Sequence, residues 1–407
     1  MPMTPARLRI IGASHDASPF AVAVFTAAIF ALLPISTDLY LPALPALRQD
    51  FGISSAQSQL TLSAFIVGFG LAQLLYGPIS DRFGRRPALL AGIVLYAVAS
   101  VACILAPSIH ALVAARFLQG VGACSGQVMA RAIVRDLYPP EQGARVFAYM
   151  TFLFGLVPLF GPLIGGILTV WFGWRATFAF LLGFSLVVLA AVWFVLAETN
   201  RNPDPAATNV RRLAANARAI LGNPTFIGYS LCVTFSYCGL FSFLSASSFV
   251  IIDVLGVPTE HFGLWFMIAV VGNMVGAVAC SRLAHRLSLP RMLATAAALS
   301  FAGGSCMLAL SLAGMANPWA IILPMALYMM GHGITTPVCF AAAVGPFPGM
   351  AGTASAVLGL MQLAVAAFVG QVVLRLHDGT TLPLAAAVAL FGCAVLISEV
   401  LLVRRLS

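Results

Sequence analysis

One acid, Asp38, lies inside the first long apolar run of the chain, in the stretch LLPISTDLYLPALP at residues 32–45. No basic residue lies within nine positions of it on either side. An ionised carboxylate inside a membrane segment is costly, and such acids are functional candidates by default. Because burial favours the neutral form of a carboxyl group, Asp38 has the chemistry of a group that takes up and releases a proton. We expect the rest of the chain to build a two-sided cavity around it.

The composition indicates a membrane protein. Of 407 residues, 61% are hydrophobic and only 8% are charged, a balance that excludes a soluble domain of this size. At about 20 residues per span, the apolar runs predict an all-α protein with twelve transmembrane helices, at 20–46, 56–77, 87–106, 109–131, 145–170, 175–197, 224–250, 260–282, 290–312, 317–340, 352–376 and 380–403.

One longer polar segment divides these spans six and six. We therefore predict an N-terminal six-helix bundle at 1–197, a cytoplasmic linker at 198–223 and a C-terminal six-helix bundle at 224–407. SDRFGRRPALLA after the second span and SRLAHRLSLPRMLA after the eighth are similar, as in a duplicated transporter with its site between the halves. The linker is either a short helix on the membrane surface, with Arg211, Arg212 and Arg218 on one face, or a solvated connection.

The arginines predict the orientation, and the chain has no lysine. With the N-terminus inside, 17 arginines fall in inner loops and termini, whereas Arg48, Arg175 and Arg375 fall outside. Both termini are therefore expected in the cytoplasm. Arg7 and Arg9 precede a span that is too long for a cleavable signal, so this span is expected to remain.

The turn after the second span carries the most specific pattern, GPISDRFGRRP at residues 77–87. Gly77 and Pro78 are expected to end the helix, while Asp81 accepts hydrogen bonds and the arginines anchor at the inner surface. The run resembles the signature loop of the major facilitator superfamily. That resemblance implies a latch between the halves, with Asp81 facing span 11 near Gly352 and Thr353, and Arg85 pairing with Asp136. A generic positively charged turn is the alternative. The residues implied in gating here are Gly77, Asp81, Arg82, Arg85, Arg86 and Asp136.

Arg116, in the run RFLQGVG, is the one arginine inside an apolar run. It lies about as far from the outer end of its span as Asp38 does, roughly 9 Å, so a direct or water-bridged approach of the two is expected. The run resembles the span-4 motif of the same superfamily, which implies a role for Arg116 in proton coupling. The alternatives are that Arg116 snorkels to the outer interface, or that it holds Asp38 permanently ionised.

The fifth span contains GLVPLFGPLIGG at residues 155–166. It resembles the glycine–proline motif of antiporters in the superfamily, which implies conformational control by Gly155, Gly161, Pro162 and Gly165. Glycines at positions 161 and 165 form a small face, and Gly272 and Gly276 on the eighth span offer a matching one. We expect the two spans to pack there, although ordinary helix packing explains the same pattern.

The run TDLYLPALP at 37–45 closely resembles span 1 of the Bcr/CflA group of drug/proton antiporters. That resemblance implies export of small, largely apolar drugs across the inner membrane in exchange for protons, and thereby antibiotic resistance. It implies a monomer that uses a proton gradient, with no cofactor, metal or nucleic-acid partner and no enzymatic activity. Export or symport of a metabolite such as a sugar or amino acid, and a receptor that binds without transport, are the alternatives.

A mostly apolar pocket with few polar groups suits varied lipophilic compounds. Polar and aromatic residues in the spans that line the cavity in this superfamily are candidate substrate contacts, although each is also explained by packing. They are Tyr40, Gln127, Tyr237, Phe241, Asn273, Tyr328, Met361 and Gln362. No phosphate-binding loop, G-x-S-x-G sequence or metal-ligand spacing is present, and all eight cysteines lie in apolar runs.

Overall fold

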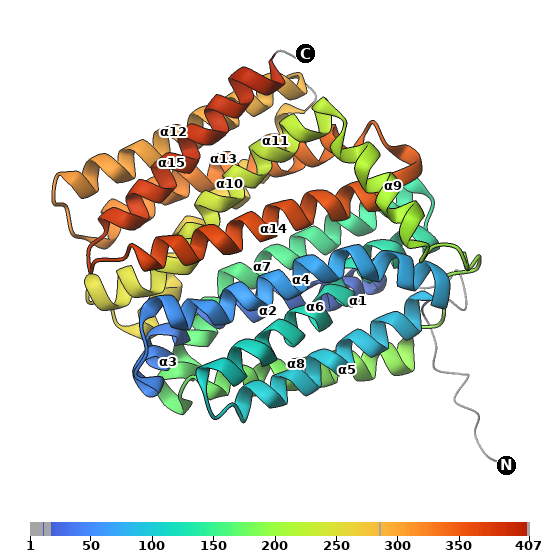
Figure 1. Ribbon diagram of the computed structural model, residues 1–407, viewed down its shortest axis with the longest axis horizontal. Coiled ribbons are helices and arrows are strands. Elements are labelled where there is room, and N and C mark those ends of the chain that lie inside the picture. The colour runs from blue at the N-terminus through green and yellow to red at the C-terminus, as the bar shows by residue number, and fades with distance from the viewer. Residues whose placement is uncertain (1–10, 12–17, 285, 405–407) are drawn as a thin grey trace. The chain divides into compact units, whose positions relative to one another are not determined.

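The computed structural model describes residues 11, 18–284 and 286–404, and it is almost entirely helical there (Figure 1). Arg7, Arg9 and Arg405, three of the arginines used for the orientation, lie outside the described residues. Each of the twelve expected spans coincides with a long or broken helix. Ten helices are long and apolar enough to cross a membrane, and the broken first span makes eleven within the described residues. The expected all-α membrane fold is confirmed.

The first span is broken rather than continuous. It consists of α1 (Pro19–Phe30), α2 (Leu32–Asp38), a 3-10 turn (Leu41–Ala43) and α3 (Leu44–Phe51), and it bends by 47°. Proline lacks a backbone donor and clashes with the preceding turn, so Pro34, Pro42 and Pro45 explain why this span does not form one straight helix. The consequence is that α2 ends at Asp38.

Five long helices complete the first half of the chain. They are α4 (Ser55–Phe83), α5 (Arg85–Ile104), α6 (Ile109–Leu137), α7 (Pro140–Phe172) and α8 (Arg175–Val195). Helix α6 is not among the ten most apolar helices, since Arg116, Gln119 and Gln127 lie in its middle.

The second half contains α9 to α15. These are α9 (Val210–Leu221), α10 (Pro224–Ser248) with a π-helical turn η3 (Phe249–Val254), α11 (Phe262–Leu283), α12 (Leu289–Leu312), α13 (Pro318–Val344), α14 (Ala351–Arg375) and α15 (Leu382–Ser398). The linker does contain a short helix, α9. Whether that helix lies on a membrane surface stays a prediction.

Local sequence explains where several helices begin. Ser18, Ser108, Asn223 and Asn317 precede α1, α6, α10 and α13, and each side-chain oxygen accepts a hydrogen bond from a backbone N–H three residues on. Such caps satisfy one of the backbone donors that every helix start leaves free. Proline follows the cap at three of these starts, where its fixed backbone suits the first helical position.

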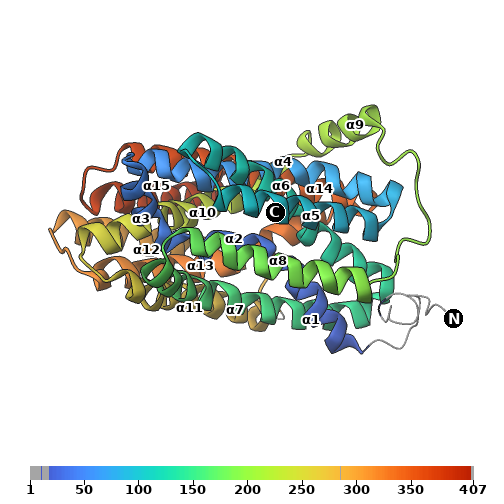
Figure 2. The ribbon, with the colours of Figure 1, turned by 90° about the horizontal axis from the view of Figure 1, so that it is seen from below.

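The chain forms two compact units. The first contains residues up to Asp38, Ala64–Pro158 and Arg175–Val210, and within it α5 contacts both α6 and α8. The second contains Leu39–Ser63, Leu159–Trp174 and Arg211–Ser407, where α13 contacts both α11 and α12, and α12 contacts α15 (Figure 2). These units are defined by which residues contact one another, and each contains separate stretches of the chain. The division of the sequence into two six-helix bundles stays a prediction.

The turn between α4 and α5 corrects one expectation. Gly77 and Pro78 do not end the helix, because α4 continues through Pro78 to Phe83. The chain reverses instead at Gly84, whose φ of +99° is a conformation that side chains rarely adopt. A Cβ on Gly84 would also lie 2.5 Å from a carboxylate oxygen of Glu198, but that side chain is flexible, so the positive φ is what favours glycine there.

Candidate functional site

Asp38 is the last residue of α2 and is 5% exposed. Its Oδ1 accepts a hydrogen bond of 2.9 Å from the Thr37 hydroxyl. Helix α2 contacts α6 and α8, so the carboxyl group lies inside the first unit at a helix end. A carboxyl group with one neutral hydrogen-bond donor and little access to water is suited to exist in both protonation states.

Arg116, on α6, is completely buried. Its Nη2 donates to the Ser36 carbonyl oxygen at 3.1 Å, and its Nη1 donates to Gln119 Oε1 at 2.6 Å. The guanidinium lies 4.4 Å from the Phe65 ring centroid and 5.6 Å from that of Phe178, a cation–π arrangement. Burial of this kind does not fit a side chain that snorkels to the membrane interface.

The Ser36 carbonyl is one of the last four of α2, which have no partner within their helix. A positive charge at this end is favoured by the helix dipole. Arg116 therefore caps the helix that ends on Asp38. Asp38 is not among the acids that form ion pairs in the described part of the chain, so the direct pairing of the two is not observed.

A buried polar network extends from this cap to α5. Ser36 Oγ lies 2.5 Å from the Tyr96 hydroxyl, Gln119 donates to Ser100 Oγ at 2.8 Å, and Ser100 donates to the Tyr96 carbonyl. All four side chains are fully buried. Sequence reasoning missed these residues. Their signal was the presence of hydroxyl and amide groups in apolar spans, where buried polar groups need partners.

Gly165, in the glycine–proline motif of α7, lies directly against the break after Asp38. A Cβ on this residue would be 1.9 Å from the Leu39 carbonyl oxygen. Only glycine allows α7 to approach the chain so closely. Gly161 and Pro162, the neighbouring residues of the motif, are buried, while Gly155 is half-buried.

The expected pairing of the glycine faces is wrong. Gly272 and Gly276 of α11 pack against the carbonyls of Ala326 and Met330 on α13. Spans 5 and 8 do meet, but through Gly263 of α11, where a Cβ would lie 2.4 Å from Leu163 of α7. A pair of glycines four residues apart creates a close-packing face without specifying its partner.

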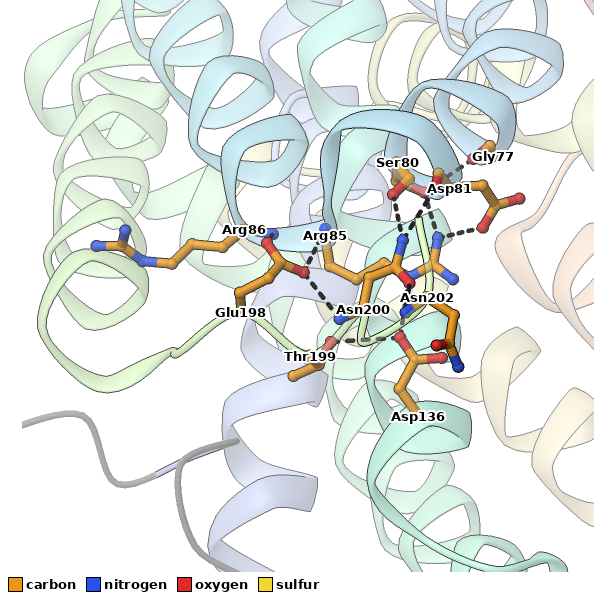
Figure 3. Close-up of polar contacts among 10 residues, drawn as sticks. All are labelled: Gly77, Ser80, Asp81, Arg85, Arg86, Asp136, Glu198, Thr199, Asn200 and Asn202. Atoms are coloured by element: carbon orange, nitrogen blue, oxygen red, sulfur yellow. Dashed lines mark hydrogen bonds and ion pairs between the residues drawn. The ribbon is translucent and has the colours of Figure 1, made fainter. Parts of the chain in front are cut away.

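Arg85 lies at the centre of an ionic cluster at the α4–α5 turn (Figure 3). Its Nε is 2.9 Å from Asp136 Oδ2, which confirms the expected pair, and its Nη1 contacts both Asp81 and Ser80 Oγ. The Arg85 side chain is 6% exposed, so these partners compensate for its desolvation. The cluster joins α4, α5 and α6.

The segment after α8 completes this cluster. The Glu198 carboxylate accepts the backbone N–H groups of Arg85 and Arg86 at 2.8 and 3.1 Å and so caps α5. Asn200 donates to the carbonyls of Ser80 and Asp81. Glu198 and Asn200 were not predicted. The available signal was an acid following the last span of the half, opposite an arginine-rich turn.

Of the other two arginines of this turn, Arg82 is exposed and Arg86 is half-buried. Arg82 donates to Thr208 Oγ1 at 2.7 Å, and its guanidinium lies over the Phe83 ring. Arg86 donates to the Trp193 carbonyl and lies over the Trp193 ring. Gly77 has open space beside it, since no atom lies within 4 Å of an added Cβ. Whether Asp81 contacts span 11 stays a prediction.

A comparison with family models now decides the family. The model of the Major Facilitator Superfamily matches residues 24–371. The chain belongs to the major facilitator superfamily. This confirms the resemblance carried by the loop and span motifs, and it makes the chain a member of a transporter family.

Individual relatives agree with this membership. The bicyclomycin resistance protein homolog of Haemophilus influenzae is 30% identical, covering 89% of this chain and 91% of the relative. Multidrug resistance protein D of Escherichia coli is 31% identical, covering 81% and 82%. Among solved structures, the xylose transporter XylE of E. coli in a partially occluded inward open conformation has a TM-score of 0.74 at 15% identity, over 96% of this chain and 98% of that one. At this identity the last comparison shows the fold alone.

In this superfamily member, the expected substrate contacts divide into two groups. Tyr40, Phe241 and Tyr328 are fully buried at helix contacts: Tyr40 bonds Thr61, Phe241 lies against Gly370, and Tyr328 fills the space beside Gly239.

The remaining candidates include side chains that are partly open. Gln127 accepts a hydrogen bond from Gln73 at 3.0 Å, and Tyr237 lies 6.1 Å from Phe241 and 6.0 Å from His332, measured between ring centroids. Asn273 and Met361 are half-buried, and Gln362 is 8% exposed. His332 bonds Ser236 at 2.9 Å, in keeping with the expected packing role. Four of the expected substrate contacts are half-buried and thus retain some exposed surface: Gln127, Tyr237, Asn273 and Met361.

A second set of contacts joins segments of the two sequence halves near the amino end of α4, all within the second compact unit. Arg48 of α3 forms an ion pair of 3.1 Å with Asp253 of η3, and its guanidinium lies over the Phe249 ring. Gln59 of α4 donates to Ser245 of α10 at 2.7 Å. We call Arg48 and Asp253 the Arg48 latch.

His377, in the loop after α14, is coupled electrostatically to the Arg48 latch. Burial lowers the pKa of His377, while Asp378 and Asp253 raise it and Arg48 lowers it, with a net downward shift. His377 is therefore neutral at pH 7, since an unperturbed histidine already titrates near 6.5. At neutral pH His377 therefore adds no charge to the Arg48–Asp253 pair.

Replacing Arg85 with Gln is expected to destabilise the protein by about 3 kcal/mol, because it leaves the largely buried Asp136 carboxylate without its ion-pair partner. Arg82→Gln changes an exposed arginine of the same turn and is expected to cost under about 0.5 kcal/mol. Thermal unfolding of the two variants in detergent measures the difference. Equal melting temperatures would show that the cluster around Arg85 does not stabilise the fold.

Proposed function

We propose that this protein exports small, largely apolar drugs or toxic compounds across the inner membrane in exchange for protons. The observation that carries the proposal is a buried acid, Asp38, at a helix break, with a neutral hydrogen-bond donor and no ion pair in the described chain. An acid held permanently ionised would be paired, whereas a group that titrates during transport needs both states within reach. The names of the resistance relatives support the choice of substrate class.

The proposed cycle assigns a separate task to each part of the site. Asp38 takes up a proton from the outer side and releases it when drug binds. Arg116 holds the end of α2 in place through the Ser36 carbonyl, so that the carboxyl group keeps its position in both protonation states. Gly155, Gly161, Pro162 and Gly165 let α7 move against the break in the first span. The half-buried residues Gln127, Tyr237, Asn273 and Met361 are proposed substrate contacts.

The orientation is part of the proposal. With the cluster around Arg85 at the cytoplasmic surface, the arginine-rich turn and both termini lie inside, as the charge asymmetry favours. The Arg48 latch then lies at the outer surface, where it must open for a drug to leave. We propose a monomer that uses the proton gradient and no cofactor.

Transport direction tests the function. Purified protein is reconstituted into liposomes, a pH gradient of known sign is imposed, and the movement of a labelled lipophilic drug is followed. Antiport predicts that drug accumulates on the side of higher proton concentration. Accumulation on the opposite side would establish symport, and exchange of drug without any response to the gradient would refute proton coupling.

The Arg48 latch provides a test with a modest expected effect. Both side chains are about a quarter exposed, at 29% and 23%, so the pair is worth roughly 1 kcal/mol or less. Asp253→Asn is expected to shift the population toward the outward-open state by up to about fivefold. Distances between spin labels on α3 and η3 measure this shift.

A charge swap serves as the control for the Arg48 latch. The double variant Arg48→Asp with Asp253→Arg restores an ion pair and is expected to return the distance distribution toward that of the wild type. Failure of the swap to reverse the single variant would show that the pair does not hold this end closed.

A further inference from the structure

Arg131 is an arginine that the proposed cycle does not use. The sequence placed it in an inner loop, but α6 continues to Leu137, so Arg131 lies six residues before the helix end. At 1.5 Å per residue this is about 9 Å inside the helix terminus. The correction matters because Arg131 lies within a helix and not in a solvated loop.

Arg131 differs from the two other arginines of the site in its partners. Arg116 donates to two oxygen acceptors, and Arg85 pairs with two acids. In the part of the chain that the structure describes, the guanidinium of Arg131 forms a cation–π contact of 5.4 Å with the Phe30 ring and no ion pair. The residue retains exposed surface, while protein atoms surround its guanidinium and no acid among the described residues lies against it.

The helix geometry shows which way Arg131 faces. It follows Gly120 by eleven residues, which returns it to within about 20° of the same face of α6. Gly120 packs against Phe65 of α4, with an added Cβ only 2.0 Å from the Phe65 carbonyl. Leu118, which is 46% exposed, lies about 140° around the helix. Arg131 therefore lies on the face directed at neighbouring helices, away from the apolar outer face.

Neighbouring side chains on this face give it a defined chemistry. Gln127, one turn before Arg131, is fixed by its hydrogen bond from Gln73 of α4. Phe30 is fixed because Gly126 lets α1 approach α6, where a Cβ would lie 2.0 Å from the Ile29 carbonyl. An aromatic ring, an amide and an uncompensated guanidinium thus share one region of the first unit. We call these residues the Arg131 site.

We propose that Arg131 is a specificity-determining residue, which makes the Arg131 site accept aromatic compounds bearing an anionic group and reject cationic ones. The inference rests on the proposed function for its role in export, but it concerns the binding step alone. A guanidinium forms strong charge-assisted hydrogen bonds with carboxylates. The same charge repels a cation, so one residue both favours one class and excludes the other.

The test uses three probes with one biphenyl body: biphenyl-4-carboxylate, biphenyl-4-carboxamide and 4-biphenylylmethylammonium. Binding to the full-length protein in neutral-lipid nanodiscs is measured without a pH gradient. The wild type is expected to bind the carboxylate most tightly and the ammonium most weakly. Arg131→Gln is expected to weaken carboxylate binding about tenfold, the size of one charge-assisted hydrogen bond, and to leave the carboxamide within about twofold.

Two further variants keep the test decisive. Arg135→Gln removes an exposed arginine one turn later on the same helix and is expected to change no probe by more than about twofold. Arg131→Lys retains the charge and is expected to keep most of the preference, which separates loss of charge from misfolding. The inference is overturned if the wild type binds the carboxylate no better than the ammonium, or if Arg131→Gln affects all three probes equally. Because no gradient is present, a failure of proton-coupled efflux leaves this result unaffected.

Discussion

Asp38→Asn is expected to abolish drug efflux driven by a pH gradient, with a loss of at least about 100-fold in the initial rate. The amide has almost the same shape as the carboxyl group, and its oxygen still accepts the hydrogen bond that Thr37 donates to Asp38. It cannot gain or lose a proton in the physiological range. The fold is therefore kept while the titrating group is removed.

Two measurements on the same proteoliposomes separate coupling from binding. Gradient-driven uptake reports coupling, whereas exchange of labelled drug for unlabelled drug at equal pH requires binding and movement only. Asp38→Asn is expected to lose the first and retain the second. This division is specific to a proton-coupling residue, because a misfolded protein would lose both activities.

A matched control comes from another acid of the chain. Asp378 lies fully exposed in the loop after α14, where Thr380 lowers its pKa by hydrogen bonding. Asp378→Asn removes one carboxylate without touching the first unit, and it is expected to transport at the wild-type rate. Gradient-driven efflux by Asp38→Asn at more than about a tenth of the wild-type rate would remove Asp38 from the coupling mechanism.

Much of the architecture follows from composition. Runs of about 20 apolar residues predict membrane helices because the bilayer leaves few other ways to satisfy the backbone, and every expected span contains helix. The Arg85–Asp136 pair was also predictable, since charges at the ends of neighbouring spans have few partners other than each other. The sequence does not predict whether a helix ends at a proline or continues through it. Thus α4 passes through Pro78, while the first span breaks at Ala31 and after Asp38.

The partner of Arg116 shows why part of the site could not be predicted. The sequence suggests an acid for a buried arginine, but the observed acceptor is the backbone carbonyl of Ser36. That carbonyl is free only because α2 stops two residues later. A partner created by a helix break leaves no trace in residue types. The same reasoning applies to Gly165, whose contact is the Leu39 carbonyl just beyond this break.

Gly165→Ala is expected to reduce transport by at least about tenfold and to lower the melting temperature. The added methyl group would lie 1.9 Å from the Leu39 carbonyl oxygen, far inside van der Waals contact. The atom that the methyl group would meet belongs to the backbone and not to a flexible side chain. Either α7 or the broken first span must therefore move. Overpacking of this kind typically costs about 1–3 kcal/mol, and here the displaced chain is the one that positions Asp38.

Gly183→Ala is the matched control, because Gly183 lies in α8 and an added Cβ there meets no atom within 4 Å. Alanine is favoured over glycine within a helix by about 1 kcal/mol, so this variant is expected to melt at or above the wild-type temperature and to transport normally. The contrast isolates the contact with Leu39 from any general effect of the substitution. Normal transport by Gly165→Ala at wild-type expression would mean that close approach of α7 to the break after Asp38 is not needed for the cycle.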